Sequence, residues 1–345
     1  NFTISGALAS ENLFMINGVP AMDNVFGFVH QFYLEDALEE TTIHSSAISA
    51  EFGRFAGGVV NAITKAGGNQ FHGSYRLSLT NDDWIARTPA SPDRQDDVRA
   101  IHELTLGGPF WKDRLWFFVA GRLDPSTDES KLTARTNVSY TSSYAEDRWE
   151  AKLTLSPGTG HRMTASYIER NTESTNLIHN FPVLELPALD DFQGEEGSLM
   201  ALNYTGVITP SFFLEGQYSE KKSSDVSRGR EGFGGDLIRG TPWGDFGFNP
   251  AAIANIAGFD GDRTTDERKN TDFVVKGSAF FSGRKTGSHE LVFGFDRFDD
   301  IRESNTYQSP SDFIILSYVP GISDQQDYYP SVAPGAALFW WAPVL

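Results

Sequence analysis

The chain has 345 residues, which is enough for one large domain or two ordinary ones. Its 28 basic and 46 acidic residues give a net charge of −18, which argues against nucleic acid as a partner because like charges repel. It contains no cysteine, which excludes disulfides, thiolate nucleophiles and cysteine-based zinc sites within it.

The first 70 residues contain short apolar segments separated by turn signals. Leu13 to Ile16 predicts a short strand, and Asn17-Gly18 predicts a tight turn after it because both residues tolerate positive φ. Residues 34–40 predict a short helix that is followed by a strand. The segment GVVNAITKAGG, residues 58–68, predicts a buried strand that its last two glycines end.

From residue 71 onward, apolar and polar side chains alternate with a period of two. One stretch shows the pattern clearly, with apolar residues on one face: Trp149, Ala151, Leu153 and Leu155. The other face of the same stretch is polar: Glu150, Lys152, Thr154 and Ser156. Such alternation predicts β-strands with one apolar and one polar face.

This pattern predicts nine strands, near residues 71–80, 99–108, 115–124, 147–156, 162–172, 198–208, 211–222, 271–281 and 289–299. Long connections, near 81–98, 125–146, 173–197, 223–270 and 300–345, alternate with short turns. Transmembrane β-barrels sort their connections in this way, and strands of about ten residues suit a tilted crossing of the bilayer. We therefore expect an all-β membrane protein with an antiparallel transmembrane barrel, although no apolar run is long enough for a membrane helix.

The aromatic residues fit this prediction, because Trp111 and Trp116 flank a turn and Trp149 and Tyr167 are placed near outer strand ends. A soluble β-sandwich is the alternative fold, but it gives no reason for long and short connections to alternate. Nine strands would leave two unpaired edges in hydrocarbon, so we expect the complete barrel to contain further strands.

Three segments resemble a known family. Residues 51–74, EFGRFAGGVVNAITKAGGNQFHGS, resemble the end of the plug domain in TonB-dependent outer-membrane receptors. Residues 11–24, ENLFMINGVPAMDN, are similar to an earlier plug strand and turn of that family. Residues 102–122, HELTLGGPFWKDRLWFFVAGR, are similar to the early barrel hairpin of its Oar-like branch.

The resemblance implies two domains. Residues 1–70 would be the C-terminal part of a small α+β plug domain, and residues 71–345 the first strands of a barrel that has about 22 strands. It also implies an integral protein of the outer membrane of a Gram-negative bacterium. The TonB box and the first part of the plug are not among these residues.

The resemblance further implies active transport and no enzymatic activity. A ligand would bind on the outside, and the TonB–ExbB–ExbD complex would pull on the plug and remodel it. Membrane lipid and lipopolysaccharide are expected partners, and a surface lipoprotein or other protein is a further one. The alternatives are a passive porin or adhesin barrel, a surface-assembly scaffold and a soluble carbohydrate-binding domain.

Glu51 and Arg54 are candidates for a polar latch between plug and barrel wall, and the alternative is a static ion pair inside the plug. Asn61 and Lys65, on the last plug strand, are expected to bond within the plug or to the wall. The polar faces of the strands offer four wall partners: Glu150, Lys152, Arg162 and Glu215. The plug glycines are expected to permit tight turns and close packing: Gly53, Gly57, Gly58, Gly67 and Gly68.

Residues 17–33 form a candidate ligand loop, or a loop that packs on the wall. Its candidate ligand-binding residues are Asn17, Asp23, Asn24, His30 and Tyr33. Residues 259–267 offer a candidate calcium site through their carboxylates: Asp260, Asp262, Asp266 and Glu267. Hard oxygen ligands suit Ca²⁺, but the spacing is not that of an EF-hand, and a solvated acidic loop is the alternative. No other cofactor is predicted.

Overall fold

The structure is a computed structural model. It describes residues 3–23, 27, 33–49, 52–84, 96–132, 139–176, 190–229, 261–283, 287–306, 313–317 and 339–343. Four of the residues named above, Asn24, His30, Glu51 and Asp260, lie outside these ranges, as do parts of every predicted long connection.

The N-terminal residues form a four-stranded sheet, called here the N-terminal sheet. It contains β1 (Leu13–Ile16), β2 (Val19–Pro20), β3 (Leu38–His44) and β4 (Val59–Thr64), in the order β2-β1-β4-β3. The predicted turn joins β1 to β2, with φ of 52° at Asn17 and 82° at Gly18. The predicted strands at 13–16 and 58–68 are therefore confirmed.

The predicted helix at residues 34–40 is wrong. Among the described residues of the N-terminal region, the helical segments are two short 3₁₀ turns, η1 (Ala9–Glu11) and η2 (Glu35–Ala37), and β3 begins at Leu38. β3 pairs antiparallel with β4, from Leu38 opposite Thr64 to His44 opposite Val59. Thr41, Thr42 and Ile43 are β-branched, so pairing with β4 and strand propensity together outweigh the local helical pattern.

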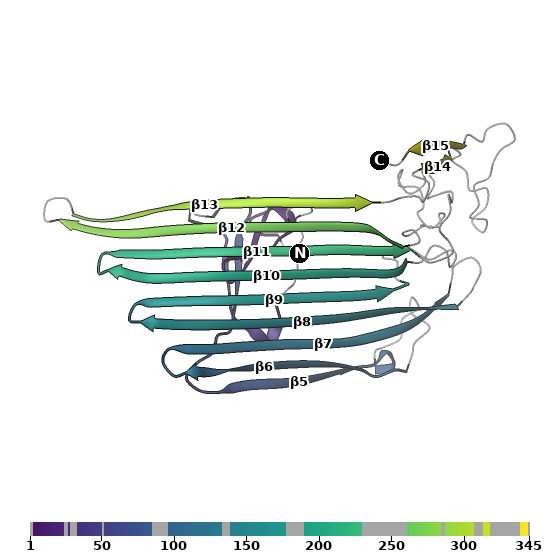
Figure 1. Ribbon diagram of the computed structural model, residues 1–345, viewed down its shortest axis with the longest axis horizontal. Coiled ribbons are helices and arrows are strands. Elements are labelled where there is room, and N and C mark those ends of the chain that lie inside the picture. Colours follow the sequence, from purple (N-terminus) through teal and green to yellow (C-terminus); the bar gives the residue numbers. More distant parts are fainter. Residues whose placement is uncertain are drawn as a thin grey trace.

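Most of the remaining described chain forms one nine-stranded antiparallel sheet, called here the wall (Figure 1). Its strands follow chain order: β5 (His72–Thr80), β6 (Arg99–Trp111), β7 (Leu115–Leu132), β8 (Ser139–Gly158), β9 (His161–Thr175), β10 (Asp190–Thr209), β11 (Phe212–Gly229), β12 (Gly261–Gly283) and β13 (Gly287–Thr306). All nine predicted strands are confirmed. The wall is an open arc in which β5 and β13 are the two edges.

The strands are longer than predicted on the side of the long connections. Residues 125–132 and 139–146 were expected to be loop, but they extend β7 and β8, which pair as far as Leu132 and Ser139. Residues 190–197, 223–229, 261–270 and 300–306 extend other strands in the same way. Polar residues continue the backbone hydrogen bonding between strands there, because this pairing does not require an apolar face. The point where apolar and polar residues stop alternating therefore marks the end of the apolar band, and the strand itself continues.

Two more short strands and one small 3₁₀ turn complete the described structure. β14 (Phe313–Ser317) pairs with β15 (Phe339–Pro343) in the region predicted as a loop, and η3 (Asp82–Trp84) follows β5. Within the described ranges, no helix is both long and apolar enough to span a membrane.

Burial in the wall is inverted relative to a soluble protein. On β8, Trp149 and Leu153 are 47% and 46% exposed, whereas Glu150 and Lys152 are 3% and 5% exposed. The same apolar face continues on other strands: Leu104, Leu106, Leu202, Phe273, Phe293 and Phe295 are all exposed. A sheet that exposes its apolar face and covers its polar face suits a bilayer outside and a filled lumen inside.

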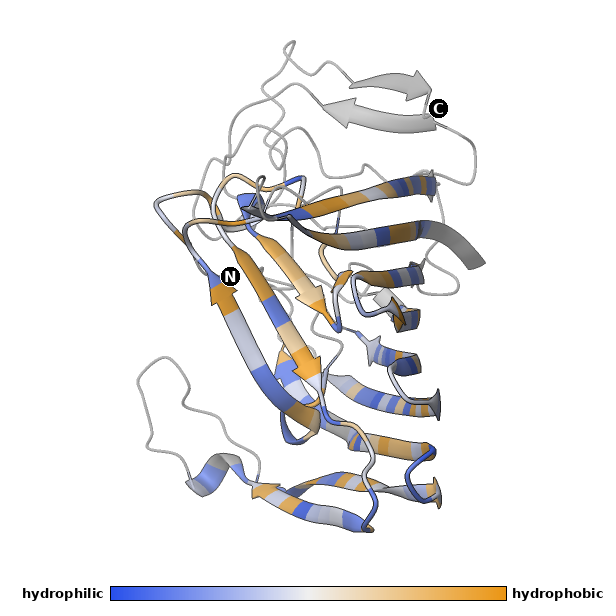
Figure 2. Cartoon of the chain, turned by 90° about the vertical axis from the view of Figure 1, so that its left-hand side faces the viewer, coloured by the Kyte–Doolittle hydropathy of each residue, from blue (hydrophilic) through white to orange (hydrophobic). Residues whose placement is uncertain are grey.

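The N-terminal sheet covers the polar face of the wall, which curves around it (Figure 2). A core cluster joins the two sheets, because Phe14, Ile16 and Val60 of the N-terminal sheet pack with Ile168 and Leu199 of the wall. A second cluster joins Leu34 and Ala37 to Phe118 and Ala120 of β7. The buried polar side chains of the wall therefore lie beneath the N-terminal sheet.

Candidate functional site: the interface between the N-terminal sheet and the wall

Basic side chains of the wall bind the main chain of the N-terminal sheet and its flanking loop. Lys152 Nζ of β8 donates to the carbonyl oxygen of Thr64 at 2.7 Å and to Asn17 Oδ1 at 3.1 Å. Arg148 Nη1 donates to the carbonyl oxygen of Tyr33 at 3.1 Å. Lys221 Nζ of β11 donates to the carbonyl oxygen of Met22. Each contact is charge-assisted, and such hydrogen bonds are stronger than neutral ones.

Carboxylates of the N-terminal region also bind wall cations. Asp23, which is 3% exposed, pairs with Arg268 of β12, and Asp36 pairs with Arg76 of β5 at 3.2 Å. Arg122 of β7 lies 3.8 Å from Glu35. We call these six residues the wall cations: Arg76, Arg122, Arg148, Lys152, Lys221 and Arg268. They spread over five strands, so the N-terminal sheet is held at many separate points.

Lys152 contributes to a compact polar network at the end of β4. Asn17 Oδ1 accepts from the Thr64 amide at 3.0 Å, and Asn17 Nδ2 donates to Thr64 Oγ1 at 3.0 Å. Lys152 Nζ donates to Thr64 Oγ1 as well as to its carbonyl oxygen. The network joins the turn after β1, the end of β4 and the wall. It provides these buried polar groups with hydrogen-bond partners.

Arg54 contacts the wall at a different place. Its Nη2 lies 3.9 Å from Asp296 Oδ2 of β13, and its guanidinium lies 3.7 Å from the centre of the Phe298 ring. The pair is about half exposed, so it is a weak contact by itself. Glu51, the other half of the candidate latch, lies outside the described residues.

The other predicted latch residues bond elsewhere. Asn61 Oδ1 accepts from the Gly18 amide at 3.1 Å, and Lys65 Nζ donates to the Asp36 carbonyl at 2.8 Å, both within the N-terminal region. Of the predicted wall partners, Lys152 contacts this region and Glu150 is buried beside it on the same face. Glu215 instead pairs with Lys276 of the wall at 3.0 Å, and Arg162 is exposed.

The glycines divide into two groups. A Cβ at Gly57 or Gly67 would collide with Asn12 or with the Phe117 backbone, and one at Gly58 would lie 2.6 Å from Ile4 Cγ2. These three permit close packing as expected. A Cβ at Gly53 or Gly68 would meet no atom of the described residues within 4 Å, so packing against them does not require glycine there.

Two candidate ligand residues contribute to the interface. Asp23 binds Arg268, and Asn17 binds Thr64 and Lys152. The ring of Tyr33 stacks on Phe14 with centroids 6.2 Å apart. Asn17 and Asp23 therefore contact the wall, whereas residues 24–26 and 28–32 of the candidate loop lie outside the described residues.

The candidate calcium residues are placed only in part. Asp266 accepts from both Arg268 and Arg302 of the wall, which occupy its two carboxylate oxygens. Glu267 is on the opposite face of β12, the one that Lys222 and Lys269 share. Within the described residues, no three acidic or histidine side chains gather as a metal site would require. The calcium site remains a sequence prediction.

The sequence did not single out Arg148, Lys221 and Arg268. Arg148 lies within the predicted strand at 147–156, four residues before Lys152, so alternation already places the two side chains on the same face. Lys221 also lies within a predicted strand, at 211–222, whereas Arg268 lies beyond the predicted strand at 271–281. The contacts of both residues with the N-terminal region became visible only with the docked N-terminal sheet.

Comparison with known proteins decides what this architecture is. Residues 63–122 match a family model described as an outer membrane beta barrel domain. The chain is 31% identical over 125 residues to the TonB-dependent transporter Oar of Myxococcus xanthus, covering 34% of this chain and 12% of that protein. The sequence-based recognition is confirmed. The chain resembles TonB-dependent outer-membrane transporters.

Solved structures agree on the fold. The outer membrane transporter YddB from Escherichia coli superposes with a TM-score of 0.64 at 16% identity, over 92% of this chain and 43% of that one. The siderophore receptor PirA from Acinetobacter baumannii gives 0.62 at 13% identity, over 87% and 42%. The present chain therefore spans less than half the length of these two proteins. It is an integral protein of the outer membrane.

Proposed function

We propose that this chain is the gated half of a TonB-dependent active transporter, in which the N-terminal sheet is part of a plug that closes the lumen. The observation that supports the proposal most directly is the binding of plug main-chain carbonyls by Arg148, Lys152 and Lys221. A carbonyl contact does not depend on the side chain of the plug residue, so it holds the plug backbone itself in place.

The chemistry of the interface suits reversible release. Hydrogen bonds to charged groups are worth about 1.5–3 kcal/mol each, and water can replace them once the plug moves. A large continuous apolar interface would instead expose hydrocarbon surface to water on opening. Mechanical work from the TonB–ExbB–ExbD complex would break the wall-cation contacts one after another, so no single step has to supply the whole free energy of plug release.

Transport then requires an outer ligand, whose binding is proposed to precede the pull by TonB. Further charged side chains of the wall, among them Arg170, Glu195 and Arg302, are 17%, 32% and 39% exposed. They give a polar approach to the plug.

Thiol labelling of intact cells tests the gate without knowledge of the ligand. Ala21 is fully buried in the interface, so an A21C variant of the full-length receptor should be shielded while the plug is docked. We expect fluorescein maleimide to label A21C in cells with TonB that grow in complete medium. Labelling should fall at least tenfold in cells without TonB or treated with a proton uncoupler.

An E129C variant provides the control, because the Glu129 side chain is 57% exposed near the long-connection end of β7 and should be labelled under every condition. Labelling of A21C that is equal with and without TonB would favour the passive porin. A21C that is never labelled, beside a labelled E129C, would favour a static scaffold.

A further inference from the structure

Three polar side chains of the wall are buried beneath the N-terminal sheet with no hydrogen-bond partner among the described residues: Glu150, through both carboxylate oxygens, and the hydroxyl groups of Thr154 and Ser166. Their exposed fractions are 3%, 2% and 4%. Ser166 of β9 is directly opposite Lys152, and Glu150 and Thr154 lie two residues to either side of Lys152 on β8. The three side chains therefore share one part of the lumen face, called here the unpaired patch.

The donors beside Glu150 are already used. Thr64 and Lys152 are its polar neighbours. The ammonium group of Lys152 has three N–H bonds, and its acceptors are Asn17 Oδ1, the Thr64 carbonyl oxygen and Thr64 Oγ1. The Thr64 hydroxyl has one proton, which it donates to Asn17 Oδ1 at 3.2 Å. Turning this hydroxyl toward Glu150 would satisfy one of its two oxygens and would take a donor from Asn17.

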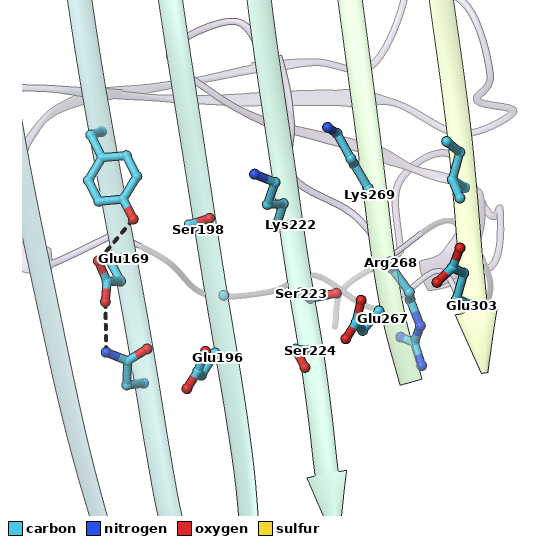
Figure 3. Close-up of a pocket in the computed structure, with 14 residues that line it drawn as sticks. Glu169, Glu196, Ser198, Lys222, Ser223, Ser224, Glu267, Arg268, Lys269 and Glu303 are labelled. Carbon is cyan, nitrogen blue, oxygen red and sulfur yellow. Dashed lines mark hydrogen bonds between the residues drawn. The ribbon is translucent and has the colours of Figure 1, made fainter. Parts of the chain in front are cut away.

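Polar side chains on the opposite face of the wall are in a different situation. Figure 3 shows Lys222, Glu267 and Lys269 around a cavity of about 440 Å³ on that face. Both lysines bind Glu220, at 2.6 and 2.7 Å, and they are 56% and 44% exposed, so water reaches them. Burial without a partner therefore distinguishes the unpaired patch from the polar groups of the outer face.

The unpaired patch weakens the docked state where it lies. Burying a polar group without a hydrogen bond is unfavourable, and most so for a carboxylate. When the N-terminal sheet moves away, water supplies the missing bonds. Glu146, on the same face of β8, shows the contrast, because it binds Arg148 at 2.7 Å and Arg170 at 3.0 Å. The wall cations thus favour the docked state, and the unpaired patch favours separation at one place.

We propose that the N-terminal sheet separates from the wall first at the unpaired patch, and that Glu150, Thr154 and Ser166 line the path that water and then a polar ligand follow. Ile168, directly opposite Glu150, belongs to the same core cluster as Ala62 of β4, so the opening lies between β4 and strands β8 and β9. The path rests on the proposed transport, whereas the weakness of the docked state at the patch does not.

Hydrogen exchange with mass spectrometry on the full-length receptor in detergent tests the weakness without TonB. Thr64, at the end of β4, binds Lys152 beside the patch, so exchange in residues 59–64 reports separation there. E150M should slow this exchange by about fivefold or more, because it removes an unsatisfied buried group. Loss of the negative charge beside Lys152 acts in the opposite direction, so it cannot cause the slowing.

Two further variants complete this test. T154V/S166A keeps every charge and should also slow exchange in residues 59–64, by about twofold or more. E146M is the matched control, since its carboxylate has partners: it should speed exchange in residues 33–38, because Arg148 holds the Tyr33 carbonyl. Exchange in E150M or in T154V/S166A that equals or exceeds the wild-type rate would overturn the proposal, since these groups would then be satisfied in the docked state.

Thiol labelling of intact cells with TonB tests the path. Ala62 is 1% exposed beside the patch, and Ala37 is 0% exposed in the second cluster, against β7. We expect fluorescein maleimide to label A62C about tenfold faster than A37C, because local opening precedes complete release. E150M should slow the labelling of A62C and leave that of E129C unchanged.

Labelling of A37C as fast as that of A62C would overturn the path. If neither thiol is labelled while E129C is, the proposed transport fails and the path fails with it. Slower hydrogen exchange in E150M would in that case still support the weakness of the docked state at the patch, so the two failures can be told apart.

Discussion

Lys152 of β8 binds Thr64 of β4 through both the main-chain carbonyl and the side-chain hydroxyl oxygen. The two residues are 88 positions apart, and they connect the wall to the last strand of the N-terminal sheet. Thr64 also binds Asn17 in the turn after β1, so one lysine holds both central strands of that sheet. Removing this ammonium group should therefore loosen the sheet as a unit.

Lys152→Met should increase hydrogen exchange in residues 59–64 by about tenfold or more, because a charged hydrogen bond contributes about 1.5–3 kcal/mol. The measurement is hydrogen exchange with mass spectrometry on the full-length receptor in detergent. Lys65→Met is the matched control, since Lys65 binds the Asp36 carbonyl within the N-terminal region. If both variants exchange like the wild type, Lys152 does not hold the plug.

Asp23 and Arg268 should show strong energetic coupling. Arg268 is 10% exposed and Asp23 is 2% exposed as side chains, so neutralising either one leaves a buried charge. Asp23→Asn and Arg268→Gln should each destabilise the docked plug. The double variant should lose less stability than the sum of the two single losses, with a coupling energy of about 0.5–3 kcal/mol.

The readout for this cycle is urea-dependent hydrogen exchange in residues 13–23. Asp225→Asn is the control, because Asp225 is a second wall partner of Arg268, at 3.6 Å, and does not belong to the plug. Additive effects of the two single substitutions would contradict a direct interaction.

Residues 65–71 join the N-terminal sheet to the wall, and Asn69 should hold this segment in place. Its Oδ1 accepts from the Asp113 amide at 2.8 Å and from Trp116 Nε1 at 2.7 Å, at the short turn after β6. Asn69→Ala should remove these hydrogen bonds and increase hydrogen exchange in residues 65–71 several-fold, with little change in residues 13–23. Gln70→Ala, one residue further, should leave exchange in both segments at the wild-type level; an equal effect of the two substitutions would refute a specific role of Asn69.

The outer face should tolerate charge only above the apolar band. Leu153→Arg places a charge on the lipid face of β8, where the cost is about 2–4 kcal/mol near the bilayer midplane. Ile301→Arg places the same charge on the outer face at the level of Lys269, where the cost should be about 0–1 kcal/mol. Unfolding in lipid vesicles, followed by heat-modified gel mobility, measures both, and equal losses would place the membrane boundary elsewhere.

Alternation alone was sufficient to locate the wall. Each predicted strand from 71–80 to 289–299 is present, because an apolar face every second residue is required wherever a strand contacts lipid. The motif at 11–24 likewise located β1 and its turn, since Asn17-Gly18 fixes the local backbone. These features depend only on neighbours in the sequence.

The tertiary structure decided where the strands end, which wall residues bind the plug and what residues 34–44 form. Polar strand ends carry no alternation signal, so the extensions of β7, β8 and β12 appear only through their pairing. Arg148, Lys221 and Arg268 differ from other polar-face residues only because the N-terminal sheet lies opposite them. Alternation in the sequence predicts which face of the strand a side chain occupies. Which residue of the N-terminal sheet it contacts depends on how these two segments, distant in sequence, pack together.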